Sequence, residues 1–165
     1  MELDRSVDDR GWFARSYCER EFGSRGLNTT WPQINLSHTK RRGALRGLHY
    51  QAAPKAEIKY VRCLAGAVFD VVVDLRAGSP TYGAWESFPL SASSGLGVYI
   101  PPGCAHGFQC LADDSLLLYQ MSEFYIPDLA RGVRWDDPTL SIDWPVPQPV
   151  ISERDRRLPL LNELP

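Results

Sequence analysis

The chain has 165 residues, a hydrophobic content of 44% and a formal net charge of −2. This length suits a single domain over residues 1–165 with a buried core, and the composition argues against disorder and against bulk nucleic-acid binding. No apolar run approaches the ~20 residues of a membrane helix, and no signal-peptide pattern opens the chain, so we expect no membrane partner.

Short runs with a period of two predict strands along most of the chain. In Ala67–Leu75, for example, Val68 and Val72 alternate with Val71 and Val73. The predicted strands are Gln33–Ser37, Gly47–Gln51, Ile58–Leu64, Ala67–Leu75, Gly97–Ile100 and Ser115–Met121.

Turn signals separate these runs at residues 77–80, 93–95 and 101–103. Helix is expected only as a turn or two around Glu19–Phe22 and after Pro127. Many short strands in one domain predict an all-β sandwich or closed barrel, whose mouth suits a ligand.

The cysteines lack the paired spacing of a metal site. We expect free thiols in a reducing compartment, and therefore a cytoplasmic protein. These residues are Cys18, Cys63, Cys104 and Cys110.

The most informative motif is Arg46-Gly-Leu-His-Tyr-Gln51. It places His49 in a strand-like run, with Arg46 three residues before it and Lys59 ten residues after it. Histidine exchanges protons near neutral pH, and neighbouring cations suit a phosphate or a forming enolate. The motif favours proton chemistry on a phosphorylated substrate, although a single strand histidine is more often structural.

Further motifs follow in order along the chain. They are Asp9-Arg-Gly11, Gln33-Ile-Asn35, Lys59-Tyr-Val-Arg62, Phe69–Arg76, Ser79-Pro-Thr-Tyr82, Pro101–Phe108, Trp135-Asp-Asp-Pro138 and Ile151–Asp155. Together they resemble the dTDP-4-dehydrorhamnose 3,5-epimerase family of nucleotide-sugar enzymes, over about residues 9–155.

The resemblance implies a cupin-type jelly roll, a homodimer, no cofactor and a nucleoside-diphosphate sugar as substrate. It further implies inversion of C3 and C5, or of C3 alone, in a nucleotide-linked 4-keto-6-deoxy sugar. The expected reaction converts dTDP-4-dehydro-6-deoxy-D-glucose to dTDP-4-dehydro-L-rhamnose through an enolate, in the route to dTDP-L-rhamnose or a related deoxysugar.

The same resemblance assigns the catalytic roles. His49 matches the base, Asp155 the carboxylate that orients it, and Tyr119 the acid on the opposite face of the sugar. Lys59 is the candidate for stabilising the ketone oxygen. Without the resemblance, Asp155 would be a surface turn residue and Tyr119 a core residue.

The resemblance also assigns substrate-binding residues, whose cations suit the diphosphate and whose aromatic residue suits the base. These are Arg10, Gln33, Asn35, Arg46, Lys59, His106, Tyr125 and Arg154. Strict alternation places Arg46 and His49 on opposite strand faces, so a bulge or the reach of arginine must reconcile them. His106 could equally be satisfied within a turn; support from Asp70, a carboxylate that is costly to bury unpaired, would favour binding.

The chain departs from the family pattern at two positions where the family usually carries glutamate, here Arg15 and Ala130. These departures leave the nucleotide and sugar open. Asp9-Arg-Gly11 also lies unusually near the first residue, so we expect that a preceding family strand is missing or lies upstream.

Two other functions compete with the epimerase. A metal-dependent cupin would need several histidines on one ion, and only His38, His49 and His106 are present, so we expect no metal site. A non-catalytic sugar-nucleotide-binding cupin would not need a base and an acid together.

Overall fold

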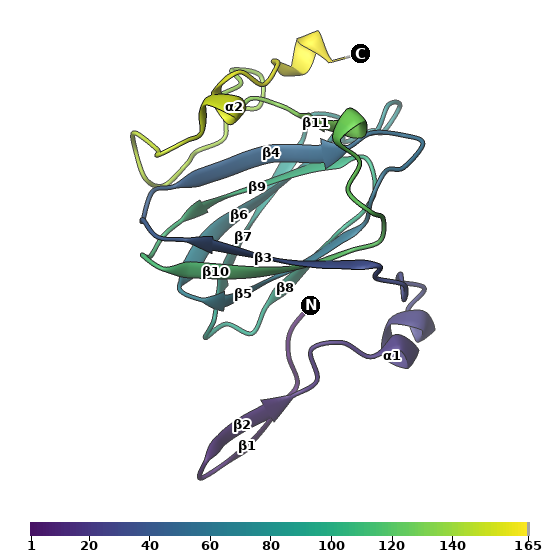
Figure 1. Ribbon diagram of the computed structural model, residues 1–165, viewed down its shortest axis with the longest axis vertical. Helices are drawn as coiled ribbons and strands as arrows, with labels where there is room; N and C mark the ends of the chain where they lie inside the picture. Colours follow the sequence, from purple (N-terminus) through teal and green to yellow (C-terminus); the bar gives the residue numbers. More distant parts are fainter. Residues whose placement is uncertain (165) are drawn as a thin grey trace.

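The computed structural model describes residues 1–164 and shows two antiparallel sheets packed face to face (Figure 1). The strand order is β3-β10-β5-β8 in one sheet and β11-β4-β9-β6-β7 in the other. The strands are β3 Gln33–Thr39, β4 Leu45–Gln51, β5 Lys59–Ala65, β6 Ala67–Asp74, β7 Trp85–Ser91, β8 Gly97–Ile100, β9 Cys104–Cys110, β10 Ser115–Met121 and β11 Ala130–Gly132. The predicted all-β jelly roll is confirmed.

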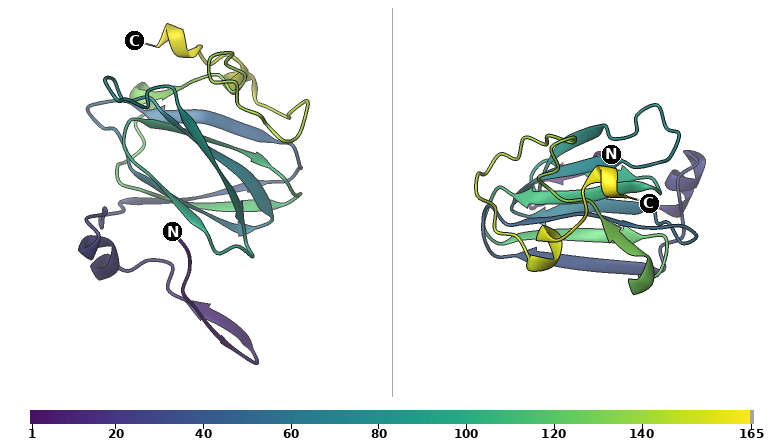
Figure 2. Two further views of the ribbon diagram at one scale, coloured as in Figure 1. Left: turned by 180° about the vertical axis from the view of Figure 1, so that it is seen from behind. Right: turned by 90° about the horizontal axis from the view of Figure 1, so that it is seen from above.

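A hairpin of β1 (Arg5–Asp8) and β2 (Gly11–Ala14) projects away from the sheets, as both orientations show (Figures 1 and 2). In the described part of the chain, helix is limited to α1 (Glu19–Ser24), α2 (Glu153–Arg156) and the 3₁₀ turns η1 (Pro127–Leu129) and η2 (Leu161–Glu163). No helix within residues 1–164 is long and apolar enough to cross a membrane.

The main core lies between the two sheets. Val61 and Leu117 from one sheet pack with Val68 and Phe108 from the other, and all four are almost fully buried. Their alternation along the strands directs these side chains inward. Truncating a buried aromatic such as Phe108 to alanine would cost about 3–5 kcal/mol.

A second apolar layer covers the outer face of the five-stranded sheet. Val71 and Val73 of β6 pack there with Val133, Leu140 and Leu161 of the C-terminal segment. This segment is held by the buried Asp137, which accepts hydrogen bonds from the backbone N–H groups of Leu140 and Leu161. Both faces of β6 are therefore covered, which explains its nearly continuous apolar sequence.

Asp74 closes the turn after β6. Its carboxylate accepts hydrogen bonds from Arg76 (Nη2, 2.7 Å), Ser79 (Oγ, 2.6 Å) and Thr81 (Oγ1, 2.7 Å). The hydrogen bond from Arg76 is the main reason that the pKa of Asp74 lies far below its usual value. The motif Ser79-Pro-Thr-Tyr82 thus includes two donors to a structural carboxylate.

All six predicted strands are present, with ends that differ by at most two residues. The hairpin, β7, β9 and β11 were not predicted. Strand β9 is buried on both faces, so it lacks alternation, and β7 is an edge strand interrupted by Pro89. The helical turns near Glu19 and after Pro127 are confirmed, whereas α2 was not predicted. The four cysteines are free thiols, as expected.

Candidate active site

A cavity of about 500 Å³ is lined by inward-facing side chains from both sheets and by the segment around α2. Eight of the eleven predicted site residues line it, namely Asn35, Arg46, His49, Lys59, His106, Tyr119, Arg154 and Asp155. Leu36, Ser37, Phe108, Met121 and Ser152 complete the wall and were not predicted. The tertiary fold therefore collects side chains from across more than a hundred residues of sequence.

His49 forms a close pair with Asp155, with 2.8 Å between Nε2 and Oδ1. The Asp155 side chain is only 6% exposed, whereas that of His49 is 37% exposed toward the cavity. Because Nε2–H donates to the carboxylate, the other ring nitrogen, Nδ1, carries the free lone pair in neutral histidine. This nitrogen is the candidate proton acceptor.

Asp155 is held by backbone geometry as well as by His49. The Ser152 hydroxyl caps α2 by accepting from the backbone N–H of Asp155 at 3.1 Å, and Gly47 N–H donates to Oδ2 at 3.3 Å. Burial alone would raise the pKa of Asp155, but the hydrogen bonds from His49 and Gly47 outweigh it and the pKa is lowered. Asp155 is therefore a buried, ionised helix residue and not a surface turn residue.

A bulge explains how Arg46 and His49 reach the same cavity. The pairing of β4 with β9 shifts register between these two residues, which interrupts strict alternation. Gly47 lies in the shift with a φ of +128°, and a Cβ there would lie 2.5 Å from the Cα of Gly107. Only glycine fits at this close approach of two strands.

Lys59 is buried beside the histidine and is already paired. Its Nζ lies 3.1 Å from Glu57 Oε1 and donates to the carbonyl oxygen of His49 at 3.2 Å. Glu57 was not predicted as part of the site. The carboxylate balances the lysine charge and holds the ammonium group at the cavity wall.

Tyr119 and His106 form a second group of polar side chains. The His106 Nε2 lies 2.8 Å from Asp70 Oδ2, and its ring meets that of Tyr119 edge-on at 5.9 Å. Burial raises the pKa of Tyr119 well above its usual value, and the negative charge of Asp70 adds to the rise. Tyr119 therefore remains a protonated donor at neutral pH. The predicted support of His106 by Asp70 is present.

Comparison with known proteins identifies the family. The family model described as dTDP-4-dehydrorhamnose 3,5-epimerase matches residues 1–163. The chain belongs to this family. It is therefore an isomerase of the epimerase class.

Similar proteins cover nearly the whole chain. The dTDP-4-dehydrorhamnose 3,5-epimerase of Pseudomonas aeruginosa is 46% identical, covering 91% of this chain and 83% of its own. The dTDP-4-dehydrorhamnose 3-epimerase of Streptomyces niveus is 44% identical, covering 97% and 77%. The solved 3,5-epimerase of Bacillus anthracis, with TDP and PPi bound, has a TM-score of 0.94 and 40% identity, covering 96% and 91%.

Three residues assigned from the epimerase resemblance do not line the cavity. Gln33 and Tyr125 lie together, since Gln33 Oε1 accepts from the backbone N–H of Tyr125 at 3.1 Å. Arg10 lies at the turn of the projecting hairpin, where its side chain is 91% exposed and pairs with Asp8. The protomer alone does not bring Arg10 to the cavity.

The two departures from the epimerase pattern also lie outside the cavity wall. Arg15 forms an ion pair with Glu21 at 2.7 Å, and Ala130 begins β11 opposite Gln51. Across residues 1–164, no three His, Cys, Asp or Glu side chains are grouped as metal ligands. The described residues contain three separate His–Asp pairs, each with a single histidine.

Proposed function

We propose that this epimerase inverts C3 and C5 of dTDP-4-dehydro-6-deoxy-D-glucose to give dTDP-4-dehydro-L-rhamnose. The observation that carries the proposal is the pairing of His49 with the buried Asp155 in one cavity, which Tyr119 lines from the opposite sheet. The relatives' names contain dTDP-4-dehydrorhamnose, which supports a dTDP-linked keto sugar, and the TDP of the Bacillus anthracis structure supports a nucleoside diphosphate.

In the first step, Nδ1 of His49 removes the proton from a carbon next to the ketone. The carbon–hydrogen bond electrons form the enolate, with the negative charge on the C4 oxygen. Asp155, which accepts the Nε2–H, stabilises the imidazolium that results.

Lys59 stabilises the enolate oxygen, because a fixed ammonium beside developing charge lowers the barrier. His106, held by Asp70, supplies a further polar contact to the substrate. Asn35 provides an amide at the same wall. These groups act on the sugar ring while the base acts on one of its faces.

Tyr119 then gives its proton to the opposite face of the carbon, and the enolate electrons form the new carbon–hydrogen bond. Each inversion leaves His49 protonated and Tyr119 deprotonated. Proton return through solvent resets both groups. The raised pKa of Tyr119 ensures that the donor is protonated at the start.

The diphosphate is proposed to bind Arg46 and Arg154, whose guanidinium groups suit bidentate contact with phosphate oxygens. The nucleotide then extends past Gln33 toward Tyr125, which is half exposed and free to stack on the base. Because Arg15 and Ala130 depart from the family pattern, another nucleotide-linked keto sugar is the alternative substrate.

We also propose a homodimer, in which a second copy covers the exposed apolar surfaces of the arm and sheet. Trp12 and Phe13 are exposed on the projecting hairpin, and Ile34 and Leu36 are exposed on the edge strand β3. Exposed apolar patches of this kind mark interaction surfaces. Seated on a second copy, the hairpin would bring Arg10 to the partner's cavity.

The dimer is tested by sedimentation equilibrium of Phe13→Ser and Ile34→Ser, with the exposed Val150→Ser as control. We expect the first two variants to dissociate and the control to match the wild type. Arg10→Gln should remain dimeric but raise KM. Monomeric wild-type protein with full activity would contradict the proposal.

The reaction is tested by proton NMR of the protein with dTDP-4-dehydro-6-deoxy-D-glucose in deuterated water. Deuterium at both C3 and C5 supports the 3,5-epimerase. Deuterium at C3 alone would indicate a single-centre epimerase. The Streptomyces niveus relative is named as a 3-epimerase of this kind. Binding without exchange would indicate a non-catalytic sugar-nucleotide-binding protein or a different sugar.

A further inference from the structure

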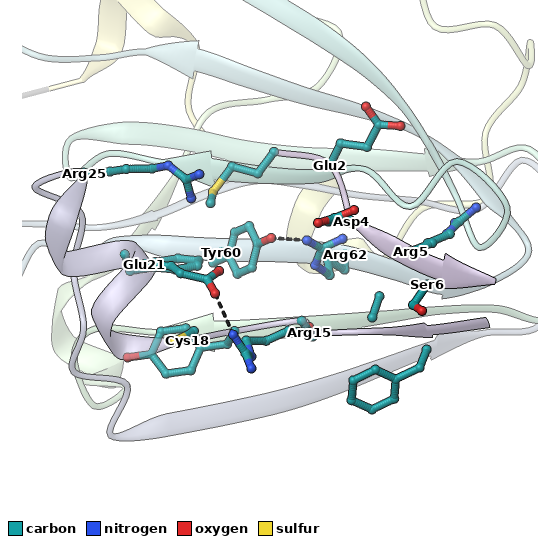
Figure 3. Close-up of a pocket in the computed structure, with 16 residues that line it drawn as sticks. Glu2, Asp4, Arg5, Ser6, Arg15, Cys18, Glu21, Arg25, Tyr60 and Arg62 are labelled. Carbon is teal, nitrogen blue, oxygen red and sulfur yellow. Dashed lines mark hydrogen bonds and ion pairs between the residues drawn. The ribbon is translucent and has the colours of Figure 1, made fainter.

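A second cavity, here called the arm cavity, lies between residues 1–18, helix α1 and the outer face of the four-stranded sheet (Figure 3). Its volume is about 480 Å³. Tyr60 and Arg62 of β5 form its floor, and no residue of the candidate active site lines it. The function proposed above makes no use of this cavity.

Arg62 is a buried cation without a counter-ion among residues 1–164. The residue is 5% exposed, and its guanidinium donates to Gly95 O at 2.7 Å and to the Tyr60 hydroxyl. Its Nε makes no hydrogen bond to any residue that the structure describes. A guanidinium has five N–H donors, so most of them remain unused. A buried charge of this kind is costly unless an anion or further acceptors balance it.

Tyr60 provides a second donor at the same place. Its hydroxyl oxygen is occupied as the acceptor from Arg62, and within the described part of the chain its own O–H reaches no acceptor. The residue is 1% exposed, so bulk solvent does not freely satisfy it. Both side chains of the cavity floor therefore have N–H or O–H donors that lack a hydrogen-bond acceptor among the described residues.

The charges around the cavity also favour an anion. Four arginines and three carboxylates line it: Arg5, Arg15, Arg25, Arg62, Glu2, Asp4 and Glu21. Arg15 and Glu21 neutralise each other in an ion pair (Figure 3). Over residues 1–164 neither Glu2 nor Asp4 forms an ion pair with an arginine. Within residues 1–164 no carboxylate therefore pairs with the Arg62 guanidinium, and the other unpaired charged side chains of the lining are two arginines and two carboxylates.

We propose that the arm cavity is an oxyanion-binding site, in which a phosphate or carboxylate group accepts hydrogen bonds from Arg62 and Tyr60. Such a group would balance the guanidinium charge and satisfy the tyrosine proton together. The oxyanion has two possible sources, a free phosphorylated metabolite or an acidic side chain of a second copy of this chain. The second source rests on the proposed homodimer.

The site is tested by titrating the full-length protein with inorganic phosphate, after thymidine diphosphate has been added to fill the candidate active-site cavity. Binding is followed by the change in the ¹H–¹⁵N NMR signal of Arg62 Nε–H. Arg62 lines the arm cavity and not the candidate active site. Tyr60→Phe removes one donor and retains the ring. Arg20→Gln, on the exposed face of α1 and outside the cavity lining, is the matched control.

A saturable shift supports a free anion if the Kd obtained from it rises about tenfold or more in Tyr60→Phe but not in the control. A hydrogen bond to a charged group is worth about 1.5–3 kcal/mol, and each 1.4 kcal/mol is a factor of about ten in Kd. A carboxylate from the second copy is supported if phosphate does not shift the Arg62 signal and if Tyr60→Phe, but not the control, weakens dimer affinity by a similar factor. No shift and unchanged self-association would overturn the site. Epimerase turnover, measured separately, distinguishes this outcome from failure of the proposed function.

Discussion

Asp155→Asn removes the charge that supports the proposed base with little change in side-chain volume. The carboxylate lies 2.8 Å from His49 Nε2 and is 6% exposed, whereas the imidazole is 37% exposed, so water screens the pair only in part. With charge centres ~4 Å apart and an effective dielectric constant of ~20, the attraction to an imidazolium is about 4 kcal/mol. This attraction forms as the proton is transferred, so most of it lowers the barrier.

A loss of about 4 kcal/mol from the barrier corresponds to a rate decrease of about 10³-fold. We expect kcat to fall by about this factor while KM changes little, because Asp155 contacts His49 and not the arginines proposed to bind the diphosphate. The assay is deuterium exchange at C3 and C5 by proton NMR, together with product formation.

Glu153→Gln, on the same helix but exposed, is the control for changes in α2 and should retain wild-type kinetics. Asp137→Asn removes a buried carboxylate away from the cavity, and it should lower the melting temperature but not the exchange rate of the folded protein. Exchange in Asp155→Asn within threefold of wild type would refute the assignment of His49 and Asp155 as the base pair.

The remaining predictions concern the acid, the enolate and stability. Tyr119→Phe should reduce product formation more than proton loss, measured in the same NMR experiment, and equal losses would contradict its role as the acid. Lys59→Met should lower kcat about 10²-fold through the lost oxyanion contact, and an effect on KM alone would indicate simple binding. Asp74→Asn should destabilise the fold by about 2–4 kcal/mol in urea unfolding, since charged acceptor bonds are lost. Because its folded pKa is depressed, this contribution is present above the unfolded carboxyl pKa near 4 and decreases as pH falls toward the folded pKa, so wild type and variant should converge in acid.

Individual site residues differ in how far their roles could be predicted. The motif around His49 carries a chemical signal of its own, because histidine and neighbouring cations suit proton transfer beside an anion. Asp155 carries no such signal, since an aspartate in a polar C-terminal segment usually faces water. Only the docking of α2 against β4 removes it from solvent and places it 2.8 Å from the histidine.

The role of Glu57 could not be predicted from the sequence for a related reason, and the sequence left open whether a bulge or the reach of arginine brings Arg46 and His49 together. A glutamate next to a strand is ordinarily a surface residue, and its contact with Lys59 depends on how the strand end is buried. The register shift between Arg46 and His49 arises from the close approach of Gly47 to Gly107, residues sixty positions apart. No local pattern encodes such a contact.

The amino-acid sequence alone determined the strand-rich class, the positions of six alternating strands and the family, because side-chain periodicity and ordered motifs are local properties. It did not reveal β9, whose two faces are both buried by elements distant in sequence. The tertiary structure decided which side chains share the cavity, that Arg10 lies outside it, and that Arg62 is buried without a counter-ion among the 164 described residues. Burial and charge pairing depend on distances between remote segments, and those distances exist only once the two sheets have packed.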